Sequence, residues 1–135
     1  MATENENTQV IIGCAIEVHK NLGPGLLESV YEESLCYELK QSNMTFKRQQ
    51  QVPIKYKSAK LSSPLRLDLF VENQIIVEVK AKEETTPIDK RQLLTYLRLL
   101  DKQVGLIINF NVKRLVDGVT RVVNQFRESP EAFKL

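Results

Sequence analysis

The stretch RLDLFVENQIIVEVK, residues 66–80, constrains the fold more than any other part of the chain. It predicts two short strands joined by a polar turn, because apolar residues alternate on both sides of the ENQ triplet. Directly paired residues of an antiparallel hairpin point the same way. If the aliphatic sides of both strands pack on one core, Val71 pairs with Ile75, and the same register pairs Asp68 with Glu78. The expected aliphatic sides are Leu65, Leu67, Leu69 and Val71 on the first strand and Ile75, Val77, Val79 and Ala81 on the second.

This register places two carboxylates opposite each other between apolar neighbours. Like charges in facing positions destabilise a sheet, and partial burial strengthens the repulsion. Two interpretations fit these residues about equally well. A divalent cation such as Mg²⁺, which prefers hard oxygen ligands, could bind Asp68 and Glu78, with Lys80 on the same side of the strand. Alternatively, Arg66 and Lys80 could neutralise the two acids in a surface cluster without any metal.

The remaining periodicities predict a small α/β domain. Helices are expected over residues 8–22, 27–41 and 87–100, and strands over residues 44–57, 66–71, 75–81 and 104–110, with a short strand after Gly118. The continuously apolar run at 104–110 indicates a strand buried on both faces, and a second copy of the chain could supply part of that cover as a homodimer. Pro53 indicates an edge strand or a bulge. We expect one domain over residues 8–126, a disordered segment over 1–7 and a tail over 127–135.

Composition fits one ordinary globular core. The chain has 135 residues, of which 42% are hydrophobic and 27% charged. No window has the apolar length that a bilayer span requires, and the N-terminal residues lack the pattern of a secretory signal. We therefore expect a cytoplasmic protein that does not enter a membrane. Cys14 and Cys36 are expected to be buried, reduced thiols.

Basic residues concentrate between residues 40 and 66. This segment carries seven lysines and arginines and no acid, although the net charge of the whole chain is only +2. It could follow a phosphate backbone, or it could be a lysine-decorated edge strand that resists aggregation. Charge alone favours the edge strand.

Two of the expected helices carry polar residues beside their apolar stripes. Glu28 and Tyr31 lie three residues apart on the second helix, where a glutamate could add a third carboxylate to the acid pair. Gln92 and Tyr96 lie four residues apart on the third helix and so share a face. By default, such residues are the solvent edge of an amphipathic helix. His19 could act as a general base or contact a phosphate, although a lone helix histidine is more often packed or exposed. We assign no clear chemistry to the glutamines at 49–51.

Taken together, these residues make the chain resemble the GxxExxY family of the PD-(D/E)XK nuclease superfamily. The family's naming motif stands as Gly25, Glu28 and Tyr31 in GLLESVY, within the longer block AIEVHKNLGPGLLESVYEESL. LRLDLFVENQIIVEVKA is similar to the family's hairpin, and QLLTYLRL and VGLIINFNV are similar to the helix and strand that follow it. The resemblance covers residues 10–123. It implies a restriction-endonuclease-like αβββαβ core, with a small mixed sheet flanked by helices and an extra N-terminal helix.

The resemblance also implies a site and an activity, the Mg²⁺- or Mn²⁺-dependent hydrolysis of phosphodiester bonds in DNA or RNA. The metal ligands would be Asp68, Glu78, the backbone carbonyl of Val79 and Glu28, and the catalytic set would add Lys80, Gln92 and Tyr96. Nucleic-acid contacts would come from Lys47, Arg48, Lys55, Lys57 and Arg66. The chain departs from the superfamily motif at Leu67, where the motif has a proline that supplies backbone shape rather than chemistry.

Two interpretations without catalysis remain open on the sequence. The chain could be a catalytically silent nuclease-like fold that binds nucleic acid or a protein without cutting. It could also be a plain interaction domain in which Arg66 and Lys80 pair with the acids. The intact set of two acids and a lysine favours the enzyme.

Overall fold

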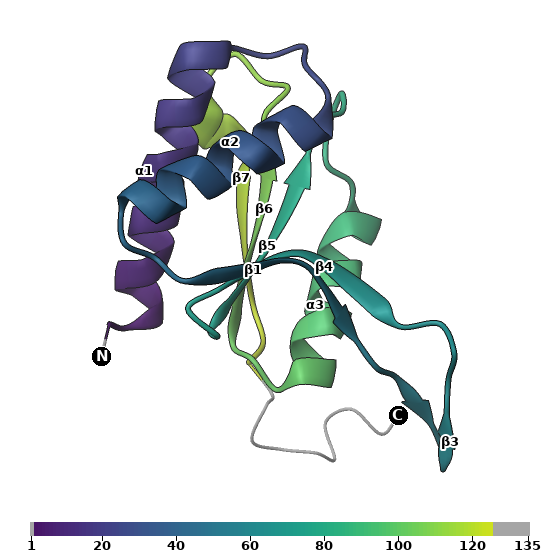
Figure 1. The fold of residues 1–135 in the computed structure, drawn as a ribbon. Helices are drawn as coiled ribbons and strands as arrows, with labels where there is room; N and C mark the ends of the chain where they lie inside the picture. Colours follow the sequence, from purple (N-terminus) through teal and green to yellow (C-terminus); the bar gives the residue numbers. More distant parts are fainter. Residues whose placement is uncertain (1, 126–135) are drawn as a thin grey trace.

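The structure is a computed structural model that describes residues 2–125, and it shows a mixed sheet between helices (Figure 1). The helices are α1 (Glu4–Leu22), α2 (Glu28–Gln41), α3 (Pro87–Leu100) and the short 3₁₀ helix η1 (Leu115–Gly118). The strands are β1 (Phe46–Val52), β2 (Lys55–Tyr56), β3 (Ala59–Lys60), β4 (Leu65–Val71), β5 (Ile75–Lys80), β6 (Val104–Asn109) and β7 (Val119–Val123). The tail predicted for 127–135 lies outside the described residues.

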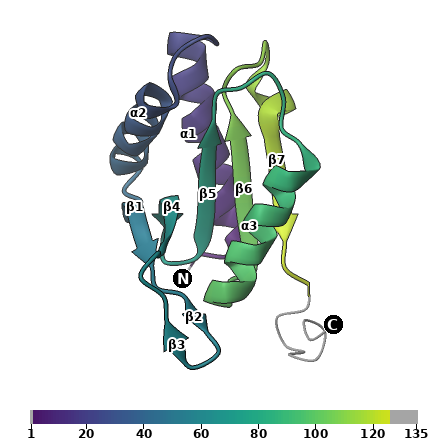
Figure 2. The ribbon, with the colours of Figure 1, turned by 90° about the vertical axis from the view of Figure 1, so that its right-hand side faces the viewer.

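Five strands form the main sheet in the order β1-β4-β5-β6-β7. Helices α1 and α2 cover one face, and α3 covers the other (Figure 2). The larger core cluster joins residues such as Ile11 and Leu35 to the first face, while Leu93 and Leu97 of α3 pack with Ile76 on the second. This architecture confirms the expected fold class, including the additional N-terminal helix.

Strand β6 is the buried centre of the sheet, as its continuous apolar run predicts. All six of its residues are buried, and it pairs in parallel with β5 and antiparallel with β7. Its Gly105 lets α3 approach closely, because a Cβ atom there would lie 2.8 Å from Cδ1 of Leu93. The chain itself therefore covers both faces of β6, and the reason for expecting a second copy to supply cover is removed.

The hairpin formed by β4 and β5 has the predicted register. Val71 pairs with Ile75 and Leu69 with Val77, around a loop of three residues. The prediction that Leu67 shares a face with Leu69 is wrong, because Leu67 packs in the α3 cluster whereas Leu69 packs under α1 and α2. Residues two apart share a face only in a regular strand. The side-chain pattern of β4 is therefore interrupted between these two leucines.

Helix α1 begins earlier than predicted. The expectation of disorder over residues 1–7 is wrong for residues 4–7, which form the first turn of the helix. The side chain of Thr3 accepts a hydrogen bond from the N–H of Glu6, whose carboxylate accepts one from the N–H of Thr3, so the two residues form a capping box. Asn7 is buried and donates from Nδ2 to Oε1 of Gln74 in the β4–β5 loop at 2.6 Å. The helix start is thus fixed by both a local and a long-range contact.

The single strand predicted over residues 44–57 is wrong beyond Val52. Strand β1 ends there, at the edge of the sheet, and Pro53 follows it. An edge position is the one that Pro53 indicated, because proline cannot donate to a ladder. Beyond it, β2 and β3 pair with each other as a separate two-stranded ribbon. The ribbon projects from the body of the molecule in both views (Figures 1 and 2).

Tyr31 fixes the loop that leads into α2. Its ring stacks on Phe110 with centroids 4.6 Å apart. Its hydroxyl donates to the carbonyl of Gly23 at 2.6 Å and accepts from the N–H of Leu26 at 3.1 Å. The loop needs glycine because Gly23 and Gly25 have φ values of 71° and 99°. The tyrosine of the GxxExxY motif thus connects the glycine turn to the end of β6.

Two further predictions concern the remainder of the chain. Cys14 and Cys36 are both free and buried, as expected. Over residues 2–125, none of the helices combines the length and the apolar character needed to cross a membrane.

We predict that Tyr31→Phe destabilises the fold while leaving the ring stack in place. The substitution leaves the carbonyl of Gly23 and the N–H of Leu26 without their partner, which typically costs about 1–3 kcal/mol. The free energy of unfolding from urea titration measures the loss. The matched control is Tyr37→Phe on α2, because Tyr37 is 61% exposed. Equal stabilities of the two variants would contradict a structural role for the Tyr31 hydroxyl.

Candidate active site

Three polar residues lie in one row across the neighbouring strands β1, β4 and β5. Gln49, Asp68 and Glu78 occupy the positions that the strand registers would pair directly. The backbone ladders skip these positions: β1 pairs with β4 on both sides of Gln49, and the β4–β5 ladder ends where Leu69 pairs with Val77. The row is therefore the place where the regular sheet is interrupted.

Side chains replace the missing backbone bonds between β4 and β5. The N–H of Asp68 donates to Oε2 of Glu78 at 3.1 Å, and the N–H of Val79 donates to Oδ2 of Asp68 at 2.8 Å. Each carboxylate thus accepts from the backbone of the other strand. This exchange holds the two acids together at one point and accounts for the break in the pattern of β4 next to Leu67.

The two acids resist ionisation in the absence of a cation. Burial raises the pKa of Glu78 to about 8, and the charge of Asp68 adds to the rise. Burial also raises the pKa of Asp68, while the hydrogen bond from Val79 acts in the opposite direction. Glu32 and Glu28 add smaller upward contributions to the pKa of Asp68. The site therefore concentrates more negative charge than its own hydrogen bonds stabilise.

Neither acid of the row is neutralised by an ion pair. Over residues 2–125, the ion pairs join Arg48 to Glu32 at 2.6 Å and Lys82 to Asp89 at 2.5 Å. Lys80 lies close enough for its charge to lower the pKa values of Asp68 and Glu78, but it forms no ion pair with either. Arg66 is exposed and also pairs with neither acid. The structure thus does not show the neutralised cluster of the alternative interpretation.

Glu32 is a third acid near the row that sequence reasoning missed. It is buried on α2 and accepts from Nε of Arg48 at 2.6 Å. Nε2 of Gln49 donates to its two carboxylate oxygens at 2.9 and 3.0 Å and lies 3.5 Å from Oδ1 of Asp68. The backbone of Gln49 has a φ of 53°, in the left-handed region that is strained for a glutamine. Glu32 and Gln49 together connect α2 and β1 to the acid pair.

The three helix residues that the resemblance assigns to the site differ in their burial and in their electrostatic relation to the acid pair. Tyr96 of α3 is half-buried, and its pKa is raised by burial and then by the charges of Glu78 and Asp68, so it lies beside the acid pair. Glu28 is exposed at the start of α2 and influences the pKa of Asp68 less than Glu32 does. Gln92 is exposed one turn before Tyr96 on α3. Of the three, Tyr96 is half-buried and affected by both acids of the pair, while Gln92 and Glu28 are exposed.

A comparison of the sequence with models of protein families shows the family to which the chain belongs. A family model described as the PD-(D/E)XK nuclease superfamily matches residues 5–122. The chain belongs to the PD-(D/E)XK nuclease superfamily. No curated protein and no solved structure matches the chain significantly. Membership of the superfamily indicates nuclease activity in general and nucleic acid as the substrate.

PD-(D/E)XK nucleases typically use divalent metals, and the acid pair fits such an ion. Asp68 and Glu78 offer hard oxygen donors that are close together and not neutralised. Over residues 2–125, no group of three or more histidine, cysteine, aspartate or glutamate side chains is arranged to hold a metal alone. Mg²⁺ commonly takes only one or two carboxylates and fills its other positions with waters and substrate phosphates. The donor set therefore fits Mg²⁺ or Mn²⁺ bound in that open manner.

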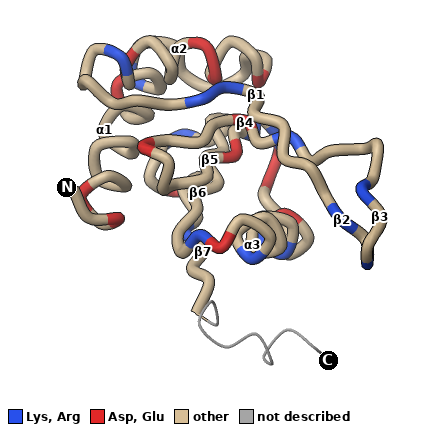
Figure 3. The backbone as a smooth tube through the Cα atoms, turned by 60° about the horizontal axis from the view of Figure 1, so that its bottom comes forward, with Lys and Arg blue, Asp and Glu red and all other residues tan. Residues whose placement is uncertain are grey.

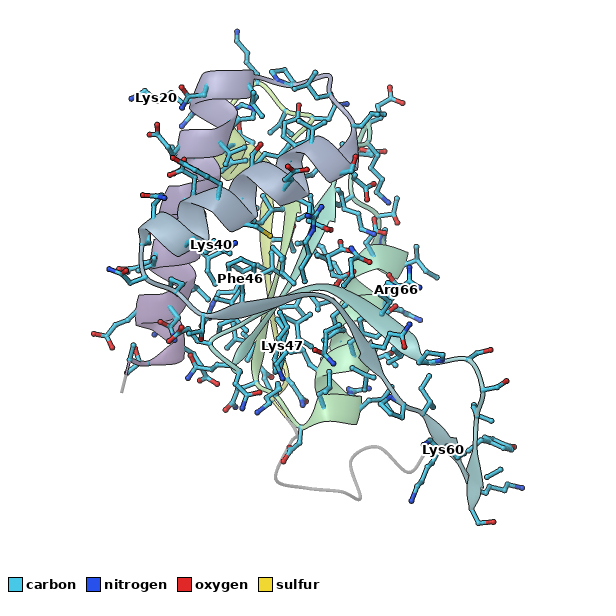
Figure 4. The ribbon with its side chains drawn as sticks, in the orientation of Figure 1. Lys20, Lys40, Phe46, Lys47, Lys60 and Arg66 are labelled. Atoms are coloured by element: carbon cyan, nitrogen blue, oxygen red, sulfur yellow. The ribbon has the colours of Figure 1, made fainter. Side chains whose placement is uncertain are left out.

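The basic residues expected to contact nucleic acid are mostly exposed. Lys47 and Arg66 lie on β1 and β4 (Figure 4), while Lys55 and Lys57 belong to the ribbon of β2 and β3, on which Figure 3 shows basic residues in blue. Arg48 differs from the other four because its Nε atom is bound to Glu32. Outside this surface, His19 forms a hydrogen bond at 2.7 Å between Nε2 and the carbonyl of Val112, which is a structural contact.

We predict that the metal-free protein becomes less stable as the pH rises from about 4.5 to about 8. In this window the folded state holds a proton on Glu78 that the unfolded state, with its ordinary pKa of 4.5, has lost. The loss amounts to roughly 3–5 kcal/mol for a shift of this size, at about 1.4 kcal/mol per pKa unit. Urea titrations at several pH values in the presence of EDTA measure it.

The control for this pH dependence is Glu78→Gln, which keeps the shape of the side chain without a titrating group. The variant should lose less stability than the wild type over the same window, because only Asp68 of the pair then retains a raised pKa, so that wild type and variant diverge with increasing pH. Parallel pH profiles of the two proteins would contradict a buried, protonated Glu78.

Proposed function

We propose that the chain is a metal-dependent nuclease of the GxxExxY family, which hydrolyses phosphodiester bonds in DNA or RNA with Mg²⁺ or Mn²⁺. One observation carries this proposal. Two carboxylates from adjacent strands, the half-buried Asp68 and the buried Glu78, are held together, and neither forms an ion pair among residues 2–125. A fold gains nothing in stability from such a pair. A site that binds a divalent ion explains why the chain retains it.

Asp68 and Glu78 would hold the ion, with the carbonyl of Val79 as a further ligand and Glu28 at the rim. The bound ion would lower the pKa of a water molecule and offset charge on the scissile phosphate. The backbone N–H of Val79 keeps Oδ2 of Asp68 oriented through the hydrogen bond at 2.8 Å. The backbone N–H of Asp68 does the same for Oε2 of Glu78. Both ligands are thus held in place before the ion binds, which favours binding.

Lys80 would act on the substrate rather than on the ion. It lies two residues after Glu78 on β5, and it forms no ion pair among residues 2–125, so its ammonium group is available for a ligand. An ammonium group in this position orients the attacking water or stabilises charge that develops on the phosphate. Tyr96 and Gln92 on the adjacent face of α3 would steady Lys80 or a phosphate oxygen.

Gln49 and Glu32 would act as positioning residues. Glu32 holds the amide of Gln49 through two hydrogen bonds, and the same amide reaches Oδ1 of Asp68 at 3.5 Å. The strained φ of Gln49 is maintained by this network, as is common at functional sites. Four exposed basic residues would contact the phosphate backbone, namely Lys47, Lys55, Lys57 and Arg66. Arg48 would also contact it while keeping its ion pair with Glu32.

We predict that Asp68→Asn, Glu78→Gln and Lys80→Ala each lower the rate of cleavage by about 100-fold or more, the scale found when one electrostatic catalytic group is removed. Cleavage of labelled DNA and RNA with Mg²⁺ or Mn²⁺ measures the effect. The control is Asp117→Asn, an exposed acid on η1. If wild type and all three variants cut at equal rates, the activity is a contaminant. If the pure wild type binds nucleic acid but never cuts it, the chain is a binding module.

We predict that Gln49→Gly lowers the rate of cleavage about 10- to 100-fold, the usual scale for groups that orient metal ligands. The stability lost with the two hydrogen bonds to Glu32 is offset in part at the backbone. Glycine adopts a positive φ readily, so it relieves strain at this position. The matched control is Gln51→Gly on the same strand, which should lose some stability and keep its activity. The rate constant at saturating substrate should fall while KM changes little. An unchanged rate for Gln49→Gly would contradict the positioning role.

A further inference from the structure

The ribbon formed by β2 and β3, here called the arm and comprising residues 54–61, is a sheet separate from the main sheet. It projects from the sheet between the end of β1 and the start of β4 (Figure 1), and it carries Lys60 away from the body of the molecule (Figure 4). The chain runs from the arm through residues 62–64 into β4, so Asp68 follows Leu61 by seven residues, a path of at most about 25 Å for an extended chain. A ligand that follows the arm inward along β4 therefore reaches the acid pair.

Two lysines face each other across the arm. Lys55 pairs directly with Lys60. The neighbouring pair, Ile54 and Leu61, is hydrogen-bonded, because the N–H of Leu61 donates to the carbonyl of Ile54 at 2.9 Å. In an antiparallel ladder, hydrogen-bonded and non-hydrogen-bonded pairs alternate. Lys55 and Lys60 thus occupy a non-hydrogen-bonded pair, in which side chains come closest together.

This lysine pair lacks an anion. Like charges in directly opposed positions destabilise a sheet, and a ribbon with two residue pairs has little stability to lose. Neither Lys55 nor Lys60 forms an ion pair among residues 2–125, and residues 40–66 contain no acid. A phosphate group between the two ammonium groups would remove the repulsion. Within the described part of the chain, the lysine pair thus carries two positive charges without an anion, just as the acid pair lacks a cation.

Tyr56 supplies a second contact of a different kind. Its side chain is 63% exposed, and its cross-strand partner is the small Ala59, so the surface beside the ring is open. Nζ of Lys57 lies over one face of the ring, 5.4 Å from its centre, so a base would stack on the other face. An exposed aromatic ring among lysines is suited to stacking with a nucleobase next to a bound phosphate.

We infer that the arm binds a single-stranded segment of nucleic acid that passes around the edge of the ribbon. A phosphate lies between Lys55 and Lys60 on one face and a base stacks on Tyr56 on the other, because successive residues of a strand point to opposite sides. This inference rests on the proposed function and specifies its substrate class. A duplex does not satisfy both contacts, because its bases already stack on each other and leave no face open to the ring. The substrate therefore presents an unpaired strand to the arm and its phosphodiester bond to Asp68 and Glu78.

The test is the fluorescence anisotropy of a labelled single-stranded oligonucleotide and of the duplex made from it, titrated with the full chain in EDTA so that nothing is cut. Tyr56→Ala should weaken single-strand binding by about 5-fold or more, the effect of losing one stacked base, and should change duplex binding little. Lys55→Ala with Lys60→Ala should reduce the slope of log affinity against log salt by about 0.7 for each phosphate that the arm no longer binds.

Two matched controls separate these effects from a general loss of charge or aromatic surface. Tyr37→Ala removes a tyrosine of similar exposure, on α2. Lys20→Ala with Lys113→Ala removes two exposed lysines, and Lys20 lies at the opposite end of the molecule from Lys60 (Figure 4). Both controls should bind like the wild type. Circular dichroism of each arm variant confirms that the fold is retained.

The inference is overturned if Tyr56→Ala binds the single strand as tightly as the wild type does, or if it weakens single-strand and duplex binding equally. It is also overturned if polyglutamate displaces the oligonucleotide as effectively as unlabelled oligonucleotide does, because the arm would then be a general anion surface. A cleaving enzyme whose arm variants bind normally leaves the proposed function intact. Arm-dependent binding without any cleavage refutes the proposed function alone.

Discussion

The exchange of hydrogen bonds between Asp68 and Glu78 is the interaction on which the rest of the site depends. Each carboxylate accepts from the backbone of the opposite strand, at 2.8 and 3.1 Å, where a regular ladder would have used backbone carbonyls. The sheet thereby loses regular pairing in the row that contains Gln49 and holds two acids that repel each other. Sheets are not stabilised by such an arrangement. The surrounding layers provide the stability that allows it to persist.

Those layers also explain why residues from distant parts of the sequence meet at the row. The stack of Tyr31 on Phe110 anchors α2 against the end of β6, so that the adjacent Glu32 contacts Gln49. On the other face, Gly105 lets α3 approach the sheet closely, and Tyr96 comes to lie beside the acid pair. The motif residues therefore divide into those that build the frame and those that could perform chemistry. Tyr31 belongs to the frame, although the motif sets it beside Glu28.

The sequence predicted the features that depend on alternation along one hairpin. The parity of aliphatic positions around residues 72–74 was sufficient to set the register and to place Asp68 opposite Glu78. It did not predict that Leu67 would change faces, because the cause is a hydrogen bond between side chain and backbone rather than a hydrophobic pattern. The capping box at Thr3 is a readable signal for the start of α1, whereas the apolar periodicity alone places that start at residue 8.

Contacts between separate elements could not be predicted in the same way. Glu32 stands four residues after Glu28 on the same helix face, but its sequence neighbours do not show that it binds Arg48 and Gln49 of β1. The sequence did not predict the arm, because apolar and polar residues alternate only weakly through Pro53 and suggested one continuous strand. The pairing of Lys55 with Lys60 shows the arm to be a separate ribbon. Long-range pairing of this kind depends on the whole fold rather than on local sequence.

Calorimetric titration with Mg²⁺ and Mn²⁺ tests the central claim most directly, namely that Asp68 and Glu78 share one ion. At pH 7 the pKa of about 8 keeps most Glu78 side chains protonated, so binding should release close to one proton. The measured heat should therefore vary with the ionisation enthalpy of the buffer, and both Asp68→Asn and Glu78→Gln should abolish binding. Silent titrations of the wild type, with and without nucleic acid, would contradict the account. Unchanged binding by the two variants would contradict it equally.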